Sequence, residues 1–342
     1  MKFIYMSVLV KHWKFAIVGL GLLMAGLSVY GQQGETGGNP FWDRSDTGDI
    51  VHVLPGPASI RSPRDTQPTF APPQSGASVN PASYGSGNLI YHGGNVMKTP
   101  AYYAIYWNST VANATATSLG YSTIQNQMAA FIGTFFTGIS YSGLTTDDYT
   151  IVGQYTDSIG SPVPAGNGLL ATWVDSKARQ SSIKDSAIRS YLAGLFNSNK
   201  VPADASGIYG IYFPSGMKVI LSGGTSCSSF CGYHSHFTYN GIQIKYAVFP
   251  YPDCSGCKLS SLTVADMLTI ISSHEIREAV TDPVENNTYA WYDAAGYEAD
   301  DKCAWHNLYQ LQRTTGLNFW VQPEYSNHLK DGLFPGPGCV QP

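Results

Sequence analysis

Residues 273–283, SHEIREAVTDP, complete a predicted helix that runs from about Thr263 to Thr281. His274 and Glu278 are four residues apart, so they lie one above the other on one face of that helix. Glu275 follows the histidine and is turned about a quarter of the way round the helix axis. The H-E-x-x-H motif of metalloproteases combines two metal ligands at this spacing with a catalytic carboxylate beside them. Glutamate stands here in place of the second histidine. We therefore expect a zincin-like helix that holds a metal ion, with zinc the first choice.

The predicted helix carries an apolar stripe that leads into this motif. Met267 and Ile271 belong to the stripe, and a step of seven residues from each reaches His274 and Glu278. Two polar groups therefore occupy the inward face, where a carboxylate is costly unless it is paired or bound to a metal. An ion pair between the two is the simpler interpretation, worth about 0.3–0.5 kcal/mol if exposed. It leaves Glu275 without a role, so we favour coordination of a cation.

An acidic segment follows the helix, which Pro283 should end. Glu298 lies twenty residues beyond Glu278, and Asp301 is three residues further on. In thermolysin-type sites, a carboxylate from a later segment completes two helix ligands, and water takes the fourth position. Asp301 or Glu298 is therefore predicted as the third ligand. The alternative is a solvated acidic turn, to which Asp300 should belong.

Composition indicates the compartment and excludes some classes of partner. The chain has 342 residues, a net charge of −4 and only 12% charged residues, so no attraction to nucleic acid or to an anionic membrane is expected. Lysines and an apolar run at 15–29 predict a signal peptide over residues 1–31, with an uncleaved membrane anchor as the alternative. Residues 32–86 are rich in Gly, Pro and Ser and are predicted as a largely disordered linker or propeptide, although 50–54 can form a strand that docks on the domain. Residues 87–342 are predicted as one globular domain.

All six cysteines lie in the last third of the chain, which indicates disulfides in an exported protein. The simplest pairing joins Cys227 to Cys231, Cys254 to Cys257 and Cys303 to Cys339, but the sequence does not fix the connectivity. A zinc site built from the first four cysteines is a sharper alternative. We favour it less, because export exposes thiols to oxidation before they can bind a metal as thiolates.

Helical and β-prone patterns alternate from about residue 88 onward. Runs rich in aromatic and β-branched residues predict strands over 101–107, 149–155, 208–213, 219–221 and 242–251. Apolar residues at helical spacing predict helices over 181–196 and over 122–136, the latter with Ser122 as N-cap. The expected fold class is α+β, or α/β, with a central mixed sheet, packed helices and disulfide-pinned loops in the C-terminal third.

Two further histidines precede the strand predicted over 242–251. His234 and His236 are two residues apart, so on a strand they would point the same way, which is a fair spacing for metal ligands. We favour the simpler interpretation of a disulfide-pinned loop whose histidines form local hydrogen bonds, because a ligand cluster needs a converging third group.

The strings HEIREAVTDP, AWYD and YEADDKC resemble the motif region of EXORDIUM-like, or phosphate-induced, proteins. SSFCGYHSHF, IKYAVFPYPDCSGC and GLNFWVQPEYSN are similar to other segments of that family, and the resemblance spans about Leu89 to Cys339. It implies a secreted protein, associated in plants with the cell wall and with growth responses, but supplies no settled biochemical activity. Some plant relatives carry a similar HExxE helix and others lack it, so the resemblance implies no universal catalytic role. Arg277 and Asp300 lie inside these motifs and can give this chain a different local charge.

The first functional hypothesis is a secreted zinc-dependent hydrolase, in particular a metallopeptidase, acting on a peptide or on a cell-wall or other extracellular substrate. His274 and Glu278 would bind the ion together with Asp301 or Glu298. Glu275 would act as general base and take a proton from the attacking water.

His234, His236 or Tyr292 is expected to stabilise the oxyanion in that hydrolase. One imidazole favours zinc, whereas calcium and magnesium, which prefer all-oxygen sites, remain alternatives. The second functional hypothesis is a non-catalytic extracellular or cell-wall-associated binding or signalling protein with a structural metal site.

Overall fold

The computed structural model describes residues 39–57, 68–70, 78–117, 119–136, 150–160, 168–284, 288–312, 318–327 and 336–341. Helices account for 22% of the residues and strands for 32%, and helices pack against a large mixed sheet. The predicted α+β class is therefore confirmed. The predicted signal peptide, residues 1–31, lies outside the described residues. Among the helices of the described part, none has the length and apolar character needed to cross a membrane.

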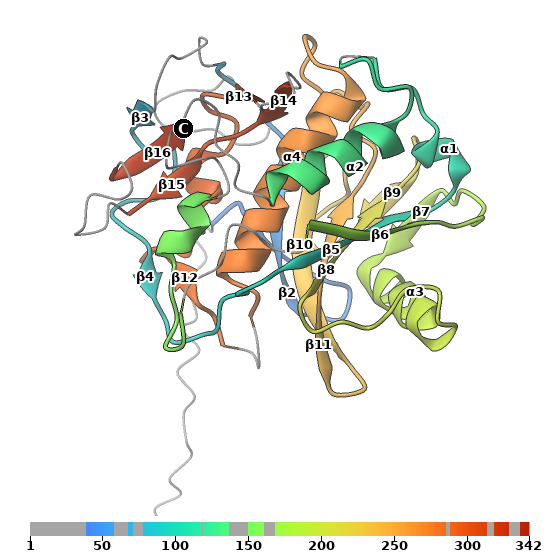
Figure 1. The fold of residues 1–342 in the computed structure, drawn as a ribbon, viewed down its shortest axis with the longest axis horizontal. Coiled ribbons are helices and arrows are strands. Elements are labelled where there is room, and N and C mark those ends of the chain that lie inside the picture. Colours follow the sequence, from blue (N-terminus) through green and yellow to red (C-terminus); the bar gives the residue numbers. More distant parts are fainter. Residues whose placement is uncertain are drawn as a thin grey trace, which may run out of the picture. The chain divides into compact units, whose positions relative to one another are not determined.

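A seven-stranded mixed sheet forms the centre of the fold (Figure 1). From one edge to the other its strands are β1 (Trp42–Arg44), β2 (Ile50–Pro55), β10 (Phe230–Tyr239), β11 (Ile242–Phe249), β8 (Gly207–Tyr212), β5 (Ala101–Tyr106) and β6 (Gly168–Val174). The last four of these run parallel, whereas β1, β2 and β10 pair antiparallel with their neighbours. β5 and β8 are buried along their whole length, as expected for strands covered on both faces.

Helices cover both faces of this sheet. The long helix α4 (Val264–Thr281) and α2 (Ile124–Phe135) share one hydrophobic core with alternate side chains of β5, among them Tyr102 and Tyr106. The other side chains of β5, among them Tyr103 and Ile105, belong to a second core with α3 (Asp185–Asn197). The short α1 (Ser109–Ala112) follows β5 directly. The period-2 alternation of β5 thus assigns its side chains to two cores.

The C-terminal part of the chain contributes the 3-10 helix η3 (Asp301–Cys303) and the pair β13 (Tyr309–Gln312) and β14 (Asn318–Val321), of which β14 packs against α4. It also contributes β15 (Glu324–Ser326) and β16 (Gly338–Gln341), which form a three-stranded sheet with β3 (Ser78–Asn80) from the N-terminal part. Two small pairs complete the fold, β4 (Ile90–Tyr91) with β12 (Trp291–Tyr292), and β7 (Ser182–Lys184) with β9 (Lys218–Ile220). Because α4 contacts both the sheet and β14, every residue from Ala265 to Thr281 is buried.

Three predicted elements differ from the structure. The predicted strand 149–155 is wrong, since this segment forms the 3-10 helix η1 (Thr150–Gln154), whose Ile151 and Val152 are fully buried. The predicted helix 181–196 begins later, because β7 pairs with β9 before α3 starts at Asp185. Thr123 rather than Ser122 caps α2, with its side chain accepting the backbone N–H of Asn126.

The prediction of a largely disordered segment over residues 32–86 is wrong for its described parts. Residues 39–57 contain β1 and β2, which extend the main sheet, and Val51, Leu54 and Phe41 are fully buried. Residues 78–80 form β3, which pairs with β16 at the other end of the chain. The strand foreseen at 50–54 is therefore part of the domain core, and the folded unit extends from Asn39 onward.

The six cysteines form three disulfides, but not all in the simplest pairing. Cys303 pairs with Cys339 as predicted, whereas Cys227 pairs with Cys254 and Cys231 with Cys257. The bridges Cys227–Cys254 and Cys231–Cys257 join the start of β10 to the loop that follows β11. The predicted bridges Cys227–Cys231 and Cys254–Cys257 would have left these two segments unconnected. The four-cysteine zinc site is wrong as well, because these sulfurs are in disulfides and are not thiolates.

Candidate metal centre

The helix α4 has well-defined ends. Thr263 and Asp266 form a capping box, in which the Thr263 hydroxyl accepts the N–H of Asp266 at 3.1 Å and the Asp266 carboxylate accepts the N–H of Thr263 at 3.0 Å. Asp282 ends the helix in a non-helical conformation, as expected for a residue before Pro283. These ends place His274, Glu275 and Glu278 in the buried C-terminal half of the helix.

His274, Glu278 and Asp301 converge on one buried point. Nε2 of His274 lies 3.0 Å from Oε2 of Glu278 and 3.7 Å from Oδ1 of Asp301. Ligands placed tetrahedrally at about 2.0–2.1 Å from zinc are about 3.3 Å apart, so these separations suit a shared cation. Within the described part of the chain, neither Nε2 nor Oε2 has a partner in hydrogen-bonding geometry, despite their short separation. The structure thus brings three of the predicted ligands together.

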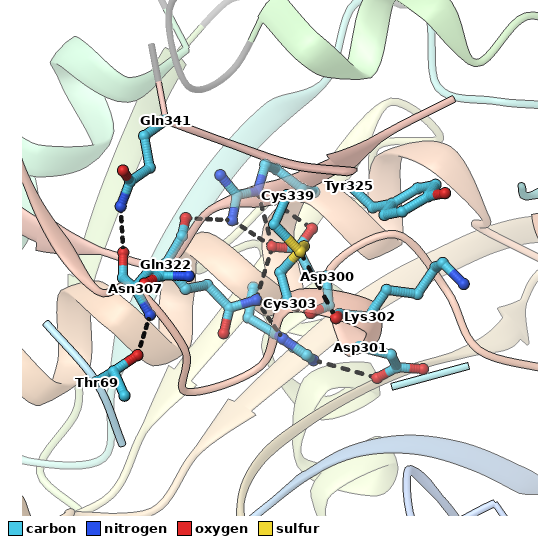
Figure 2. Close-up of a disulfide and its surroundings, with 12 residues drawn as sticks. Thr69, Asp300, Asp301, Lys302, Cys303, Asn307, Gln322, Tyr325, Cys339 and Gln341 are labelled. Atoms are coloured by element: carbon cyan, nitrogen blue, oxygen red, sulfur yellow. Dashed lines mark hydrogen bonds and ion pairs between the residues drawn. A yellow bond between two sulfur atoms is a disulfide. The ribbon is translucent and has the colours of Figure 1, made fainter. Parts of the chain in front are cut away.

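A tight turn places Asp301 beside α4. The backbone N–H of Asp301 donates to Oε1 of Glu278 at 2.9 Å, and the N–H of Glu298 donates to Oδ2 of Asp301 at 2.9 Å. The turn continues into η3, where Cys303 is linked to Cys339 (Figure 2). Each carboxylate therefore uses one oxygen to bind the backbone, which leaves its other oxygen facing His274.

His234 and His52 extend the cluster from the edge of the sheet. The interpretation of the His234 segment as a loop is wrong, because it belongs to β10 and is buried. His52 of β2 stands directly opposite His234 in the antiparallel pairing, so both side chains lie on the same face. Their rings stack at a centroid separation of 5.0 Å. Nδ1 of His52 is 2.7 Å from Oε2 of Glu298.

The side chain of Glu275, a residue of α4, points toward β10. Its Oε2 is hydrogen-bonded to Nδ1 of His234 at 3.1 Å, and the same nitrogen is 3.7 Å from Oε2 of Glu278. Its Oε1 has no hydrogen-bond partner among the side chains and backbone that the structure describes. The predicted general base is thus oriented through one oxygen and has a second oxygen available.

Asp300 does not belong to a solvated turn, contrary to our interpretation of the sequence. It is fully buried and pairs with Arg277, whose Nε lies 3.0 Å from Oδ1 of Asp300. Gln322 joins this pair to the metal cluster. Its Nε2 is 3.0 Å from Oδ1 and from the backbone oxygen of Asp300 (Figure 2). The same nitrogen is 3.0 Å from Nδ1 of His274. The charge of Arg277 is therefore balanced by Asp300 next to the cluster.

Burial dominates the protonation of these side chains. Desolvation lowers the pKa of His52 to about 4 and holds those of His234 and His274 well below their usual value. Desolvation, reinforced by repulsion between neighbouring carboxylates, raises the pKa values of five acidic groups, Glu275, Glu278, Asp282, Glu298 and Asp301. The imidazoles are neutral and can donate lone pairs, and a divalent cation would supply the positive charge that ionised carboxylates require.

A small pocket, with room for about one water molecule, reaches the cluster from the side of β2 and β10. His52, His234 and Asp282 contribute to its walls, together with His236 and Tyr289, whereas His274 and Glu278 do not line it. Access from solvent is therefore on the His52 side of the cluster.

The remaining predicted site residues lie at the margin. His236 lines the pocket but belongs to none of the groups of converging ligand atoms among the described residues. Tyr292 lies in β12, where its ring stacks on His92 at a centroid separation of 3.5 Å.

Two residues of the cluster, His52 and Gln322, were not predicted from the sequence. For His52 the available signal was a histidine inside an otherwise apolar strand segment, whereas Gln322 gave none.

Comparisons of this chain with protein-family models, with curated proteins and with solved structures found no match. The functional assignment therefore rests on the geometry of the buried cluster.

Proposed function

We propose that this chain is a secreted metal-dependent hydrolase whose ion, preferably zinc, is bound by His274, Glu278 and Asp301. The main support is the pair His274 Nε2 and Glu278 Oε2, which are buried 3.0 Å apart without forming a hydrogen bond. Buried polar atoms left without partners are costly, and coordination of one cation would remove that cost from both. Asp301 fits as third ligand better than Glu298, which instead groups with His52 and His234.

Glu275 is the proposed general base. Zinc, when bound, would acidify a water molecule and polarise a substrate carbonyl. His234 holds Oε2 of Glu275, so the unpartnered Oε1 is the oxygen that can accept a proton. Burial raises the pKa of Glu275, which suits a group that must hold a proton during turnover.

Secretion and the substrate class belong to the same proposal. Three disulfides are compatible with an extracellular protein, and the apolar N-terminal run supports export. The resemblance to EXORDIUM-like proteins supports an extracellular substrate, for which we propose a peptide first and a cell-wall polymer second.

A non-catalytic extracellular or cell-wall-associated protein with a structural metal is the second candidate. It is favoured by the burial of His274, Glu278 and Asp301, which are at most 1% exposed. Structural zinc sites are closed in this way, whereas catalytic sites keep an open position for water or substrate. In that case, Glu275 would serve only to hold His234.

Metal analysis and peptide hydrolysis together test the proposal. Full-length protein would be stripped with a chelator, reloaded with zinc, dialysed, analysed for metal content and assayed against a fluorogenic peptide library. We expect Glu275→Gln to keep its metal and to lose hydrolysis by about 100-fold or more, the usual range for loss of a general base. His274→Gln should lose the ion that His274, Glu278 and Asp301 bind. The exposed His92→Gln serves as a matched control and should lose neither metal nor hydrolysis.

Each outcome discriminates between the candidates. Reloaded wild type without bound metal would overturn both. Bound metal with no peptide hydrolysis, or hydrolysis that Glu275→Gln leaves unchanged, would overturn the peptidase and favour a structural ion.

A further inference from the structure

We propose that the cluster has a second cation position, formed by His52, His234 and Glu298, next to the first. This position uses none of the three ligands of the first site, and it includes a histidine from β2, a strand near the start of the domain in sequence. It extends the proposed function from one ion to a pair.

The three side chains present ligand atoms to one another at short range. Oε2 of Glu298 lies 2.7 Å from Nδ1 of His52 and 3.7 Å from Nε2 of His234. All three residues are at least nine-tenths buried. Two imidazoles and one carboxylate form a donor set typical of zinc and other first-row transition metals.

The hydrogen bonding of these side chains is incomplete. Within the described residues, both nitrogens of His52, Nε2 of His234 and both oxygens of Glu298 lack a partner in hydrogen-bonding geometry. A buried polar group without a partner costs roughly 1–3 kcal/mol, and this position holds five such atoms on three side chains. Asp282 also approaches Glu298, but two carboxyl groups can bond only when one is protonated. A cation would bind all three side chains without requiring that proton.

His234 connects the two positions. Its Nδ1 faces Glu275 and Glu278 of α4, whereas its Nε2 faces Glu298. One imidazole therefore lies between the two groups of ligands, so the positions are neighbours. Paired metal sites in hydrolases use such proximity to stabilise both the attacking and the leaving oxygen.

The charge of the cluster also favours two ions. Five carboxyl groups are buried around the histidines of the cluster, those of Glu275, Glu278, Asp282, Glu298 and Asp301. The buried cations of the same segments are paired elsewhere, Arg277 with Asp300 and Lys302 with Asp293. One divalent ion leaves most of the potential negative charge uncompensated in a region of low dielectric, and two ions nearly balance it.

The second position lies on the accessible side of the cluster. His52 and His234 line the pocket, whereas the helix ligands His274 and Glu278 are behind them. A water molecule that enters through this pocket would therefore meet the second ion first, which makes His52 a proposed ligand of the solvent-facing metal.

Metal counting on full-length variants tests this position. Stripped and zinc-reloaded wild type should retain two ions per chain, His52→Gln and Glu298→Gln one each, and the exposed His92→Gln two. His274→Gln should also retain one ion, because its position is separate. Circular dichroism spectra would establish that each variant is folded.

A second measurement covers the case in which His52→Gln fails to fold. Manganese-loaded wild type should give the electron paramagnetic resonance signal of a spin-coupled pair, and isolated manganese signals alone would overturn the second position. A wild type that holds one zinc ion, lost in His274→Gln and kept in His52→Gln, would overturn it while leaving the proposed function intact. No zinc in any protein would overturn both.

Discussion

Glu278→Gln distinguishes a metal site from a plain ion pair by the sign of its effect on stability. Gln keeps the shape of the side chain and an Oε1 that can accept the N–H of Asp301. It removes the negative charge from a group that is 1% exposed and lies 3.0 Å from His274. If the two residues form an ion pair, breaking it should destabilise the protein by about 3–5 kcal/mol.

The metal-site interpretation predicts the opposite for metal-free protein. Burial, and then repulsion by Asp301, raises the pKa of Glu278 well above its usual value, so the folded protein retains a proton that the unfolded chain releases above about pH 4.3. Stability then falls by about 1.4 kcal/mol per pH unit for each retained proton, starting from that pH. Glu278→Gln removes one such proton. We therefore expect the metal-free variant to be more stable than wild type, by a margin that grows from pH 5 to pH 7.

Zinc should reverse the order of the two proteins. A ligand at 100 times its Kd stabilises the folded state by about 2.7 kcal/mol, and the variant should lose most of this gain with its anionic ligand. Urea denaturation at pH 5, 6 and 7, with chelator and with excess zinc, measures both effects, and Asp253→Asn on an exposed loop is the isosteric control. A chelated variant that is less stable than wild type at every pH would refute the reasoning.

Three further substitutions test two supports of the cluster and one exposed ion pair elsewhere in the fold. Replacing Cys303 and Cys339 together by Ala should lower the free energy of unfolding, measured by urea denaturation, by up to about 4 kcal/mol, because the disulfide closes a loop with a sequence separation of 36. The double variant should also bind zinc more weakly in a competition titration, because the turn that carries Asp301 loosens. Gly232→Ala would place a methyl group 2.5 Å from Cγ2 of Ile271 and 3.0 Å from Oε1 of Glu275, so both side chains must shift. Hydrolysis should therefore fall while metal content is kept, at a cost of about 1–3 kcal/mol in thermal unfolding. Hydrogen bonds from the Thr47 hydroxyl and from Arg189 of α3 lower the pKa of Asp49, so the Asp49 carboxylate stabilises the folded protein at pH values above its unfolded pKa. Asp49→Asn should therefore reduce the free energy of unfolding by less than about 1 kcal/mol in urea denaturation at pH 7. The difference between variant and wild type should disappear as pH falls below about 4.

Local sequence patterns predicted the elements whose environment matches their periodicity. The long apolar stripe of α4 and the proline that follows it indicated its position, and aromatic, β-branched runs indicated β5 and β11. The same reasoning failed at 149–155, where a β-prone run forms η1. There, burial of Ile151 and Val152 against the domain outweighs their β-propensity, which mainly reflects the surface on which a strand packs.

The candidate site was predictable where its residues lie in α4 or in the acidic segment that follows it. The i,i+4 spacing in α4 fixes His274 and Glu278 on one face whatever the rest of the chain does. His52 reaches the cluster through the register of β2 on β10, and no local pattern determines which residue of one strand faces which residue of another. A Gly- and Pro-rich neighbourhood made this strand look like part of a linker, although its own side chains are buried.

The amide of Gln322 shows what a metal must change when it binds. A histidine that coordinates through Nε2 carries its proton on Nδ1 and usually donates it to an acceptor. Here Nδ1 of His274 faces Nε2 of Gln322, a donor that also lies 3.0 Å from two oxygens of Asp300. Turning the amide over would offer His274 the oxygen it needs but would break the bonds to Asp300, at roughly 1–3 kcal/mol each. Structural zinc sites bind with about 10–16 kcal/mol, so coordination outweighs this loss. Metal binding at His274 would therefore include a reorientation of Gln322, which the pair of Arg277 and Asp300 would have to accommodate.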